Sequence, residues 1–278
     1  MNTKYLTLVI VSLTLLLSGC DPVSDILNAD KETSNSTQKE TNTNVNTNTQ
    51  TAAPVTNTTG SLPLKQINVL VVVDANDAGT NNGTTNTKID HFMSVSNQVF
   101  QNSVVPAQLN VVGVQPYSFS STSSKGALSE VYHNQTITAV RNNVHADVVV
   151  IYRNNVNDGL CGLAYLNKTL DANIAYAHVD LTCPSTTTAH EVGHTMGLAH
   201  SINNPSSHSQ GYLAYGHGYG ISGEFTTIMS YRSTYNTNVH LFNYSSPSLE
   251  CQGYTCGDEN ANSVQALNNS INTVANFR

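Results

Sequence analysis

The sequence predicts an α/β fold, a twisted mixed sheet of five strands with helices packed against it. Strand-like and helix-like segments alternate from residue 62 to residue 278, a pattern typical of helices covering a sheet. One strand, residues 147–152, is continuous in β-branched residues, which indicates a central place in the sheet. No internal repeat is visible. The segment 62–278 therefore reads as one domain, long enough to bury a sizeable core.

Each strand is predicted by a short, largely apolar run, and each helix by apolar residues that recur every three or four positions. Residues 67–73 form a largely apolar run and predict a buried strand. In the last helix, Val264, Leu267, Ile271 and Val274 share one face. The predicted strands are 67–73, 108–114, 147–152, 162–166 and 174–181, and the predicted helices are 88–103, 135–143, 186–196 and 258–276.

One motif, H-E-x-x-H-x-x-G-x-x-H at residues 190–200, predicts a metal site. His190 and His194 are four residues apart and therefore lie on one face of a helix. Gly197 allows the sharp turn that brings His200 back as a third ligand. Three histidines leave the fourth position of a tetrahedral zinc open, as in catalytic sites. Glu191 lies beside the metal as a general base. Histidines that merely fill the core, or a zinc protein without activity, are the alternatives.

This motif resembles that of the metzincin metalloproteases, which carry a second signature, a turn with a methionine beneath the zinc. Residues 227–231 are similar to that turn, with Met229 as its methionine. An ordinary buried methionine is the alternative. The resemblance implies that Tyr231 is either a displaceable zinc ligand or a hydrogen-bond donor to the oxyanion of the tetrahedral intermediate.

Residues 161–165, followed by Cys183, resemble the reprolysin (adamalysin) branch and bacterial relatives such as peptidyl-Asp metalloendopeptidases. The resemblance implies a cleft, with the zinc in it, between a sheet half and a smaller C-terminal half. It also implies that an extended peptide binds as an antiparallel strand along the sheet edge. The substrate-binding edge residues are Gly162, Leu163, Ala164 and Tyr165. Ser201 departs from the aspartate typical of reprolysins, which leaves the branch open.

The function implied is a zinc-dependent endopeptidase that acts on extended protein or peptide substrates. Glu191 takes a proton from zinc-bound water and passes it to the leaving nitrogen. Arg232 would line the pocket for the residue after the cut and favour acidic or polar side chains, or it is simply a solvated surface residue. We expect one catalytic zinc; the sequence leaves calcium undetermined. His208 and His217 are interpreted as surface or structural.

Two other functions stay open. A zinc amide hydrolase that cuts peptidoglycan crosslinks would need the same residues, because a fold can host several chemistries. A surface lipoprotein could instead bind protein through the cleft without turnover.

Residues 1–19 predict a signal peptide, because their apolar run is too short to span a bilayer. Leu17-Ser18-Gly19-Cys20 resembles a bacterial lipobox, with cleavage before Cys20 and lipid on its thiol. An ordinary signal peptide is the alternative. Residues 20–61 are rich in Asn and Thr and predict a disordered tether. We therefore expect a lipid anchor on the extracytoplasmic side of a membrane of the bacterial cell envelope, inner or outer, or on the cell surface.

The number of cysteines is consistent with a protein that is exported from the cytoplasm. Of five cysteines, four remain once Cys20 is set aside. They suggest two disulfides, Cys161–Cys183 and Cys251–Cys256, in an oxidising compartment. Four free thiols are the alternative.

The net charge of −7, from 11 basic and 18 acidic residues, argues against nucleic acid as a partner. We expect a monomer whose partners are a protein or peptide substrate and a membrane.

Overall fold

A computed structural model describes residues 17–19, 63–80, 82–204 and 209–278. Its main sheet has the strand order β1-β5-β6-β4-β2-β3. Strands β2 (Lys65–Asp74), β3 (Ala107–Tyr117), β4 (Val148–Arg153) and β6 (Tyr176–Asp180) are parallel to one another, and β5 (Gly162–Tyr165) pairs antiparallel with β6. These are the five predicted strands, and the predicted α/β fold with a mixed sheet is confirmed.

The sixth strand is the three-residue β1 (Leu17–Gly19), which lies antiparallel on the outer edge of β5. It belongs to the predicted signal peptide. The rest of that peptide, the whole of the predicted tether with the lipidation residue Cys20, and His208 lie outside the described residues.

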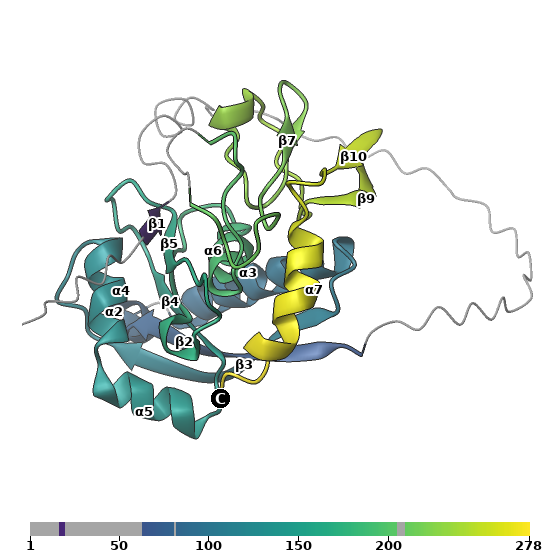
Figure 1. Cartoon of the computed structure of the whole chain (residues 1–278). Helices are drawn as coiled ribbons and strands as arrows, with labels where there is room; N and C mark the ends of the chain where they lie inside the picture. The colour runs from purple at the N-terminus through teal and green to yellow at the C-terminus, as the bar shows by residue number, and fades with distance from the viewer. Residues whose placement is uncertain (1–16, 20–62, 81, 205–208) are drawn as a thin grey trace, which may run out of the picture.

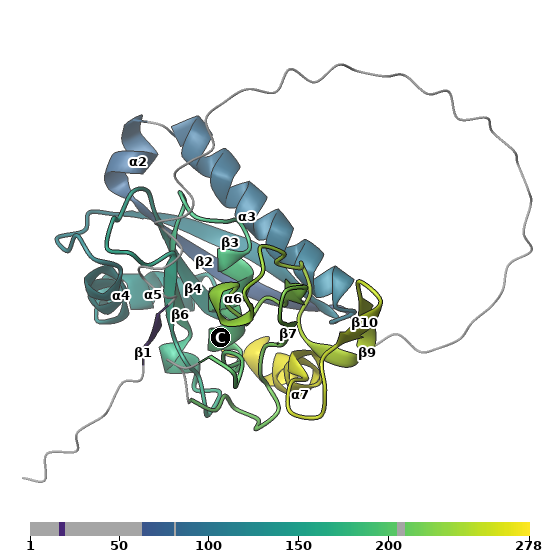
Figure 2. The ribbon, with the colours of Figure 1, turned by 90° about the horizontal axis from the view of Figure 1, so that it is seen from above.

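Helices cover both faces of the sheet (Figure 1). One face packs against α3 (Asn82–Asn102), α6 (Thr187–Thr195) and α7 (Ser263–Val274), and α3 runs along it when the molecule is seen from above (Figure 2). The other face packs against α4 (Ser124–Tyr132) and α5 (Gln135–Asn143). The short helix α2 (Ala75–Thr80) lies between β2 and α3 in the chain, and η1 (Ala172–Ile174) lies between β5 and β6. Each side of the sheet thus has its own hydrophobic core, and a smaller third cluster in the described residues forms around Phe225, Cys251 and Cys256.

After α6 the chain builds a smaller C-terminal part from short elements. They are β7 (Gly220–Ile221), β8 (Phe225–Thr226), η2 (Ser233–Tyr235), β9 (Ser246–Cys251) and β10 (Tyr254–Cys256). Helix α7 then returns to contact β2 of the main sheet. Because α6 lies between the sheet and this second part, residues from both parts surround it (Figure 1).

Several boundaries differ from the predictions. Helix α3 begins six residues before the predicted start at 88, and α4 was not predicted. The last helix begins at Ser263 and not at Asp258, because Asp258 and Ala261 bond to each other's main chain and Asn262 caps the helix with its side chain. By contrast, α5 has the predicted bounds.

Both predicted disulfides are confirmed. Cys161–Cys183 links the residue before β5 to the turn before α6, and Cys251–Cys256 closes the β9–β10 hairpin. The first therefore ties the sheet edge to the entrance of the histidine-bearing helix.

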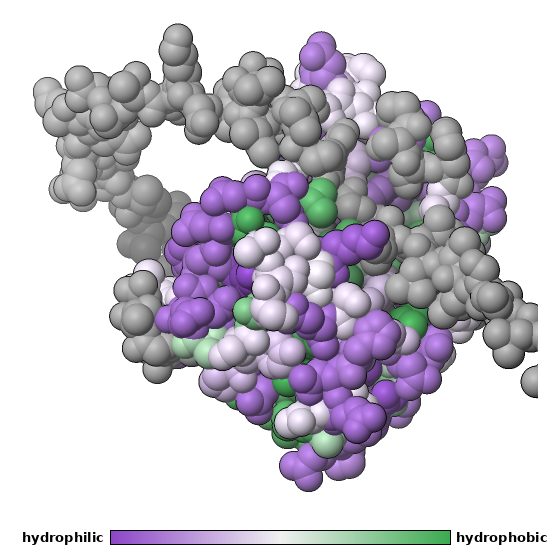
Figure 3. Space-filling model, turned by 90° about the vertical axis from the view of Figure 1, so that its left-hand side faces the viewer, coloured by the Kyte–Doolittle hydropathy of each residue, from purple (hydrophilic) through white to green (hydrophobic). Residues whose placement is uncertain are grey.

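The apolar side chains are gathered inside the molecule. On the face in Figure 3, the described surface is largely hydrophilic, and the hydrophobic residues occur singly or in small groups. Among the described residues, no helix is both long enough and apolar enough to cross a bilayer.

Candidate metal centre

All nine residues of α6 are buried, so this helix is part of the core as well as the bearer of the histidines. Ala189 and Val192 pack into the core that α6 shares with α3 and α7. His190 and His194, one turn apart, face the C-terminal part. Thr186 precedes the helix and Met196 ends it, as the motif predicts.

The three predicted ligands come together. The Nε2 atom of His200 lies 2.9 Å from His190 Nε2 and 3.0 Å from His194 Nε2. One ligand atom from each histidine lies within 4.8 Å of the others, and in the described part of the chain this is the only such group of three or more His, Cys, Asp or Glu residues. Nitrogens about 2.0–2.1 Å from a tetrahedral zinc would lie roughly 3.3 Å apart, close to the spacing seen here.

Main-chain carbonyls orient the two helical imidazoles. His190 Nδ1 is 2.7 Å from the Ile228 carbonyl oxygen, and His194 Nδ1 is 2.8 Å from that of Leu198. A carbonyl only accepts, so each Nδ1 carries the proton and each Nε2 presents a lone pair. Two lone pairs that face His200 Nε2 are best satisfied by a cation between them. The residues present therefore fit a metal ion.

Burial keeps these imidazoles neutral. It lowers the pKa of His190 to about 4 and, together with the nearby His190, that of His194 to about 3. Burial and the neighbouring imidazoles also lower the pKa of His200 well below its usual range. Because a metal binds the neutral imidazole, all three are ready to act as ligands at neutral pH.

Gly197 makes the turn that the motif predicts. Its φ is +95°, and a Cβ there would lie 2.6 Å from Tyr212 Cβ. Both observations require glycine.

The turn returns the chain to His200, whose carbonyl accepts a hydrogen bond from His217 Nδ1 at 2.7 Å. His217 is buried, so of the two predicted roles, surface or structural, the structural one fits.

The predicted methionine turn packs against α6 at Gly193. Met229 is fully buried, and a Cβ on Gly193 would come within 2.8 Å of its sulfur. The Met229 carbonyl accepts a hydrogen bond from the Ser201 amide at 3.0 Å. Ser201, the departure from the reprolysin pattern, pairs through its hydroxyl with the Tyr235 hydroxyl at 2.6 Å.

Tyr231 extends from this turn to the histidines. Its hydroxyl lies 3.0 Å from His200 Nε2, and its ring stacks on that of His190 with centroids 6.0 Å apart. The phenol thus lies at the metal-facing edge of the triad, where it can act as a ligand or as a donor.

Glu191 is fully buried, and its side chain points toward the sheet edge. A Cβ on Gly162 of β5 would lie 2.5 Å from Glu191 Oε1. Of the predicted edge residues, Gly162 and Ala164 alternate with Leu163 and Tyr165, which pack into the opposite core. The outer side of β5 is paired with β1 in the register Ser18↔Ala164. It can therefore hold an extended, antiparallel segment.

Arg232 and His240 are two further basic residues, and His240 lies near both His190 and Arg232. Arg232 is partly exposed and follows Tyr231 directly. His240 Nδ1 lies 3.0 Å from Thr226 Oγ1, and burial lowers the pKa of His240 to about 3, with further lowering by the nearby His190 and Arg232. Sequence reasoning did not single out His240, because it lies 40 residues from His200 in a segment without a motif.

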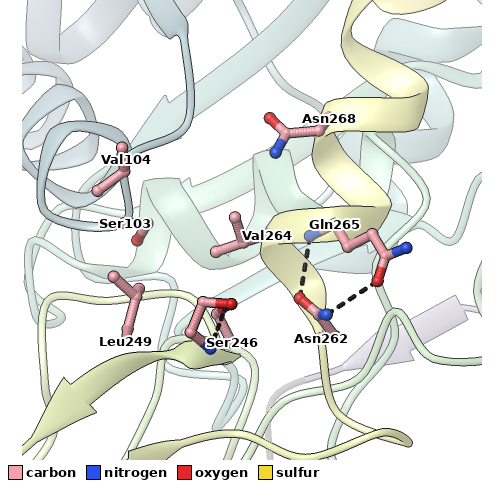
Figure 4. Close-up of a pocket in the computed structure, with 9 residues that line it drawn as sticks. Ser103, Val104, Ser246, Leu249, Asn262, Val264, Gln265 and Asn268 are labelled. Atoms are coloured by element: carbon pink, nitrogen blue, oxygen red, sulfur yellow. Dashed lines mark hydrogen bonds between the residues drawn. The ribbon is translucent and has the colours of Figure 1, made fainter. Parts of the chain in front are cut away.

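A pocket of about 450 Å³ lies elsewhere, between the end of α3, β9 and the start of α7 (Figure 4). Its lining is neutral, from Val104 and Leu249 to Asn262 and Asn268. With neither an ionisable group nor a histidine in that lining, the pocket has no evident part in the chemistry of the triad.

The site is that of a metallopeptidase. It combines a mixed sheet, a buried helix that carries two histidines and a methionine turn, all arranged around one triad of imidazoles. The family model of metallo-peptidase family M12 matches residues 63–243, and the chain belongs to that family.

Similar proteins agree with this assignment. The chain is 28% identical to a peptidyl-Asp metalloendopeptidase of Pseudomonas aeruginosa, over 77% of this chain and 40% of that protein. It is 30% identical to one of Stenotrophomonas maltophilia, over 76% of this chain and 52% of that protein. The chain thus spans about half the length, or less, of these relatives. A solved structure titled "Structure of a chaperone-substrate complex" shares the fold, with a TM-score of 0.65 and 22% identity over 78% of this chain and 35% of that one.

Proposed function

We propose that this protein is a zinc-dependent endopeptidase that hydrolyses extended protein substrates outside the cytoplasm. The observation that carries the proposal is the triad of neutral, oriented imidazoles, with Glu191 next to the first of them on α6. Membership of family M12 supports the same conclusion.

His190, His194 and His200 would hold one zinc ion, because three imidazole nitrogens at this spacing suit its tetrahedral preference. Zinc supplies Lewis-acid chemistry there and lowers the pKa of water. The Ile228 and Leu198 carbonyls keep the two helical ligands in the correct tautomer throughout the reaction.

Glu191 performs the proton transfers. As the neighbour of the first ligand on α6, its carboxylate accepts the proton of the attacking water and delivers it to the leaving nitrogen. Tyr231 donates its hydroxyl proton in a hydrogen bond to the oxyanion, from its place 3.0 Å from His200 Nε2.

Strand β5 positions the substrate. An extended peptide that pairs with its outer edge runs antiparallel to it, in the place that β1 takes. The side chain after the cut would lie near Arg232, whose positive charge favours an acidic residue. The relatives named for peptidyl-Asp cleavage support aspartate as that residue.

Cleavage of a peptide library tests the proposal. We expect purified residues 62–278 to cut beside aspartate and a zinc chelator to abolish the activity. Glu191→Gln should lower kcat by about 100- to 10,000-fold, the usual contribution of a general acid–base. Tyr231→Phe should lower it by about 100-fold, as loss of one oxyanion donor does. Tyr254→Phe, at an exposed position on β10, is the control. A folded, zinc-loaded domain that leaves every peptide intact would contradict the proposal.

The location proposed is the outer side of a bacterial membrane, through lipid on Cys20. Cleavage before Cys20 would also remove β1 from the edge of β5 and leave that edge free for substrate. In a bacterium that expresses the full chain, we expect labelled fatty acid on the protein and its recovery with membranes. Cys20→Ala should lose both. Equal labelling of the variant would exclude Cys20 as the acylated residue.

A further inference from the structure

Gly162, the first residue of β5, lies directly against the side chain of Glu191. A Cβ at Gly162 would lie 2.5 Å from Glu191 Oε1, 2.6 Å from its Cγ and 2.7 Å from its Cδ. Carbon atoms in proteins do not approach so closely without repulsion. Because Cγ is involved as well as the terminal oxygen, rotation of the carboxylate alone would not relieve the contact.

The edge strand is held in this position. Gly162 pairs with Val179 of β6, and the Cys161 carbonyl accepts the Asp180 amide at 2.8 Å. The Cys161–Cys183 disulfide fixes the same end of the strand. Strand β5 therefore has little freedom to move away from α6.

The helix is held from its other side. A Cβ on Gly193 would meet the Met229 sulfur at 2.8 Å, and His190 Nδ1 bonds to the Ile228 carbonyl. Two glycines thus bring α6 close to its neighbours, one against the sheet edge and one against the methionine turn. Any side chain at Gly162 must displace Glu191, because neither backbone can retreat.

We infer that Gly162 is a positioning residue: its missing side chain is the space in which the Glu191 carboxylate is held beside the triad. The catalytic part of this inference rests on the proposed function, but the steric part does not. Alanine at Gly162 leaves the main-chain N–H and C=O unchanged, so the pairing of β5 with an extended peptide stays intact.

A thermal-unfolding cycle tests the steric part without any activity. Gly162→Ala should lower Tm in the otherwise unchanged protein. In the Glu191→Ala background, where Cγ, Cδ and the oxygens are gone, the same substitution should lower Tm much less. If Gly162→Ala alone does not fold, recovery of folding in the double variant has the same meaning. Equal losses of Tm in both backgrounds would overturn the inference.

Gly113→Ala is the matched control for a glycine within a strand. It lies on β3 at the far edge of the sheet, and a Cβ there would lie 3.3 Å from Leu70 Cδ1. Its effect on Tm should be the same whether position 191 is Glu or Ala.

Peptide hydrolysis tests the catalytic part. Gly162→Ala should lower kcat by about 10- to 100-fold, as small displacements of catalytic groups do, with KM and zinc content unchanged. In the Glu191→Asp background, with its shorter side chain, the further loss should be under threefold. A raised KM with unchanged kcat would assign Gly162 to substrate binding and refute the positioning role. If the parent protein cleaves nothing, the proposed function fails, and the unfolding cycle still decides the steric part.

Discussion

His178 is a buried histidine whose ring nitrogens, unlike those of the triad, make no hydrogen bond within the described residues. In the triad, carbonyl oxygens accept from Nδ1. His178 is fully buried on β6 beside Leu163 and Ile151. Burial, aided by the charge of Arg153 and opposed by Asp158 and Asp180, lowers its pKa to about 4.

This shift predicts that acid weakens the fold. Between pH 6.5 and 4 the unfolded chain binds a proton at His178 that the folded chain does not, so the free energy of unfolding falls as pH falls through that window. The loss should be about 2 kcal/mol at pH 5. His178→Leu should remove this part of the pH dependence.

The measurement is urea unfolding at several pH values. His133→Leu replaces an exposed histidine and serves as the control. The interpretation would be wrong if His178→Leu and the parent lost stability in parallel from pH 7 to pH 5.

Among the elements, β5 and α6 depend most on covalent support. Their shared disulfide, Cys161–Cys183, spans 22 residues, and Cys251–Cys256 spans 5. In the chain-entropy model, a bridge stabilises by restricting the unfolded chain, more so for the longer loop.

We therefore expect unequal losses when each pair is replaced by alanine. Removal of Cys161–Cys183 should lower the free energy of unfolding by about 3 kcal/mol, and removal of Cys251–Cys256 by about 2 kcal/mol. Chemical denaturation of the two double variants under oxidising conditions measures both. The opposite order would contradict the entropic account.

Elements with a strong local signal were predictable. Strand β4 is a run of β-branched residues and needs no tertiary information. Helix α4 was missed because SKGALSEVY holds a glycine in its first turn and two serines, which lower its helix propensity. What starts it is a cap, Ser123 accepting from the Gly126 amide. The β9–β10 hairpin was not predicted either, because its two strands are short and bury few side chains.

The site, too, has features that the sequence predicts and features that only the folded chain shows. Its ligands lie within eleven residues, so helical geometry alone brings two of them together. The carbonyl acceptors Ile228 and Leu198, the bond from His217 and the position of His240 depend on how separate segments meet. No spacing in the sequence encodes those contacts. The role of Gly162 belongs with them, since it appears only when β5 is placed against α6.

At the scale of the whole molecule, Asp147 ties the C-terminus to the sheet. One oxygen of this buried carboxylate accepts the Asn68 amide at 2.8 Å, and the other accepts the amides of Phe277 and Arg278 at 3.1 and 3.3 Å. Asp147 thus joins the first described strand of the domain to the residues that follow its last helix.

Loss of this carboxylate should destabilise the protein. Asp147→Ala leaves several main-chain amides without an acceptor, and we expect about 2–3 kcal/mol less unfolding free energy. Asp90→Ala, at an exposed position on α3, should change it little. Equilibrium denaturation compares the two, and hydrogen exchange should show α7 opening first in Asp147→Ala. An unchanged stability would mean that water replaces the carboxylate without cost.

The complete burial of α6 has a consequence for how this protein responds to its surroundings. An ion held by His190, His194 and His200 binds the folded chain and finds no such triad in the unfolded one, so binding and folding are thermodynamically linked. At a free concentration 1,000 times the dissociation constant, such an ion adds about 4.1 kcal/mol to the free energy of unfolding. Removal of such a metal by a chelator would therefore lower the free energy of unfolding of the whole domain, and not only the activity of the site.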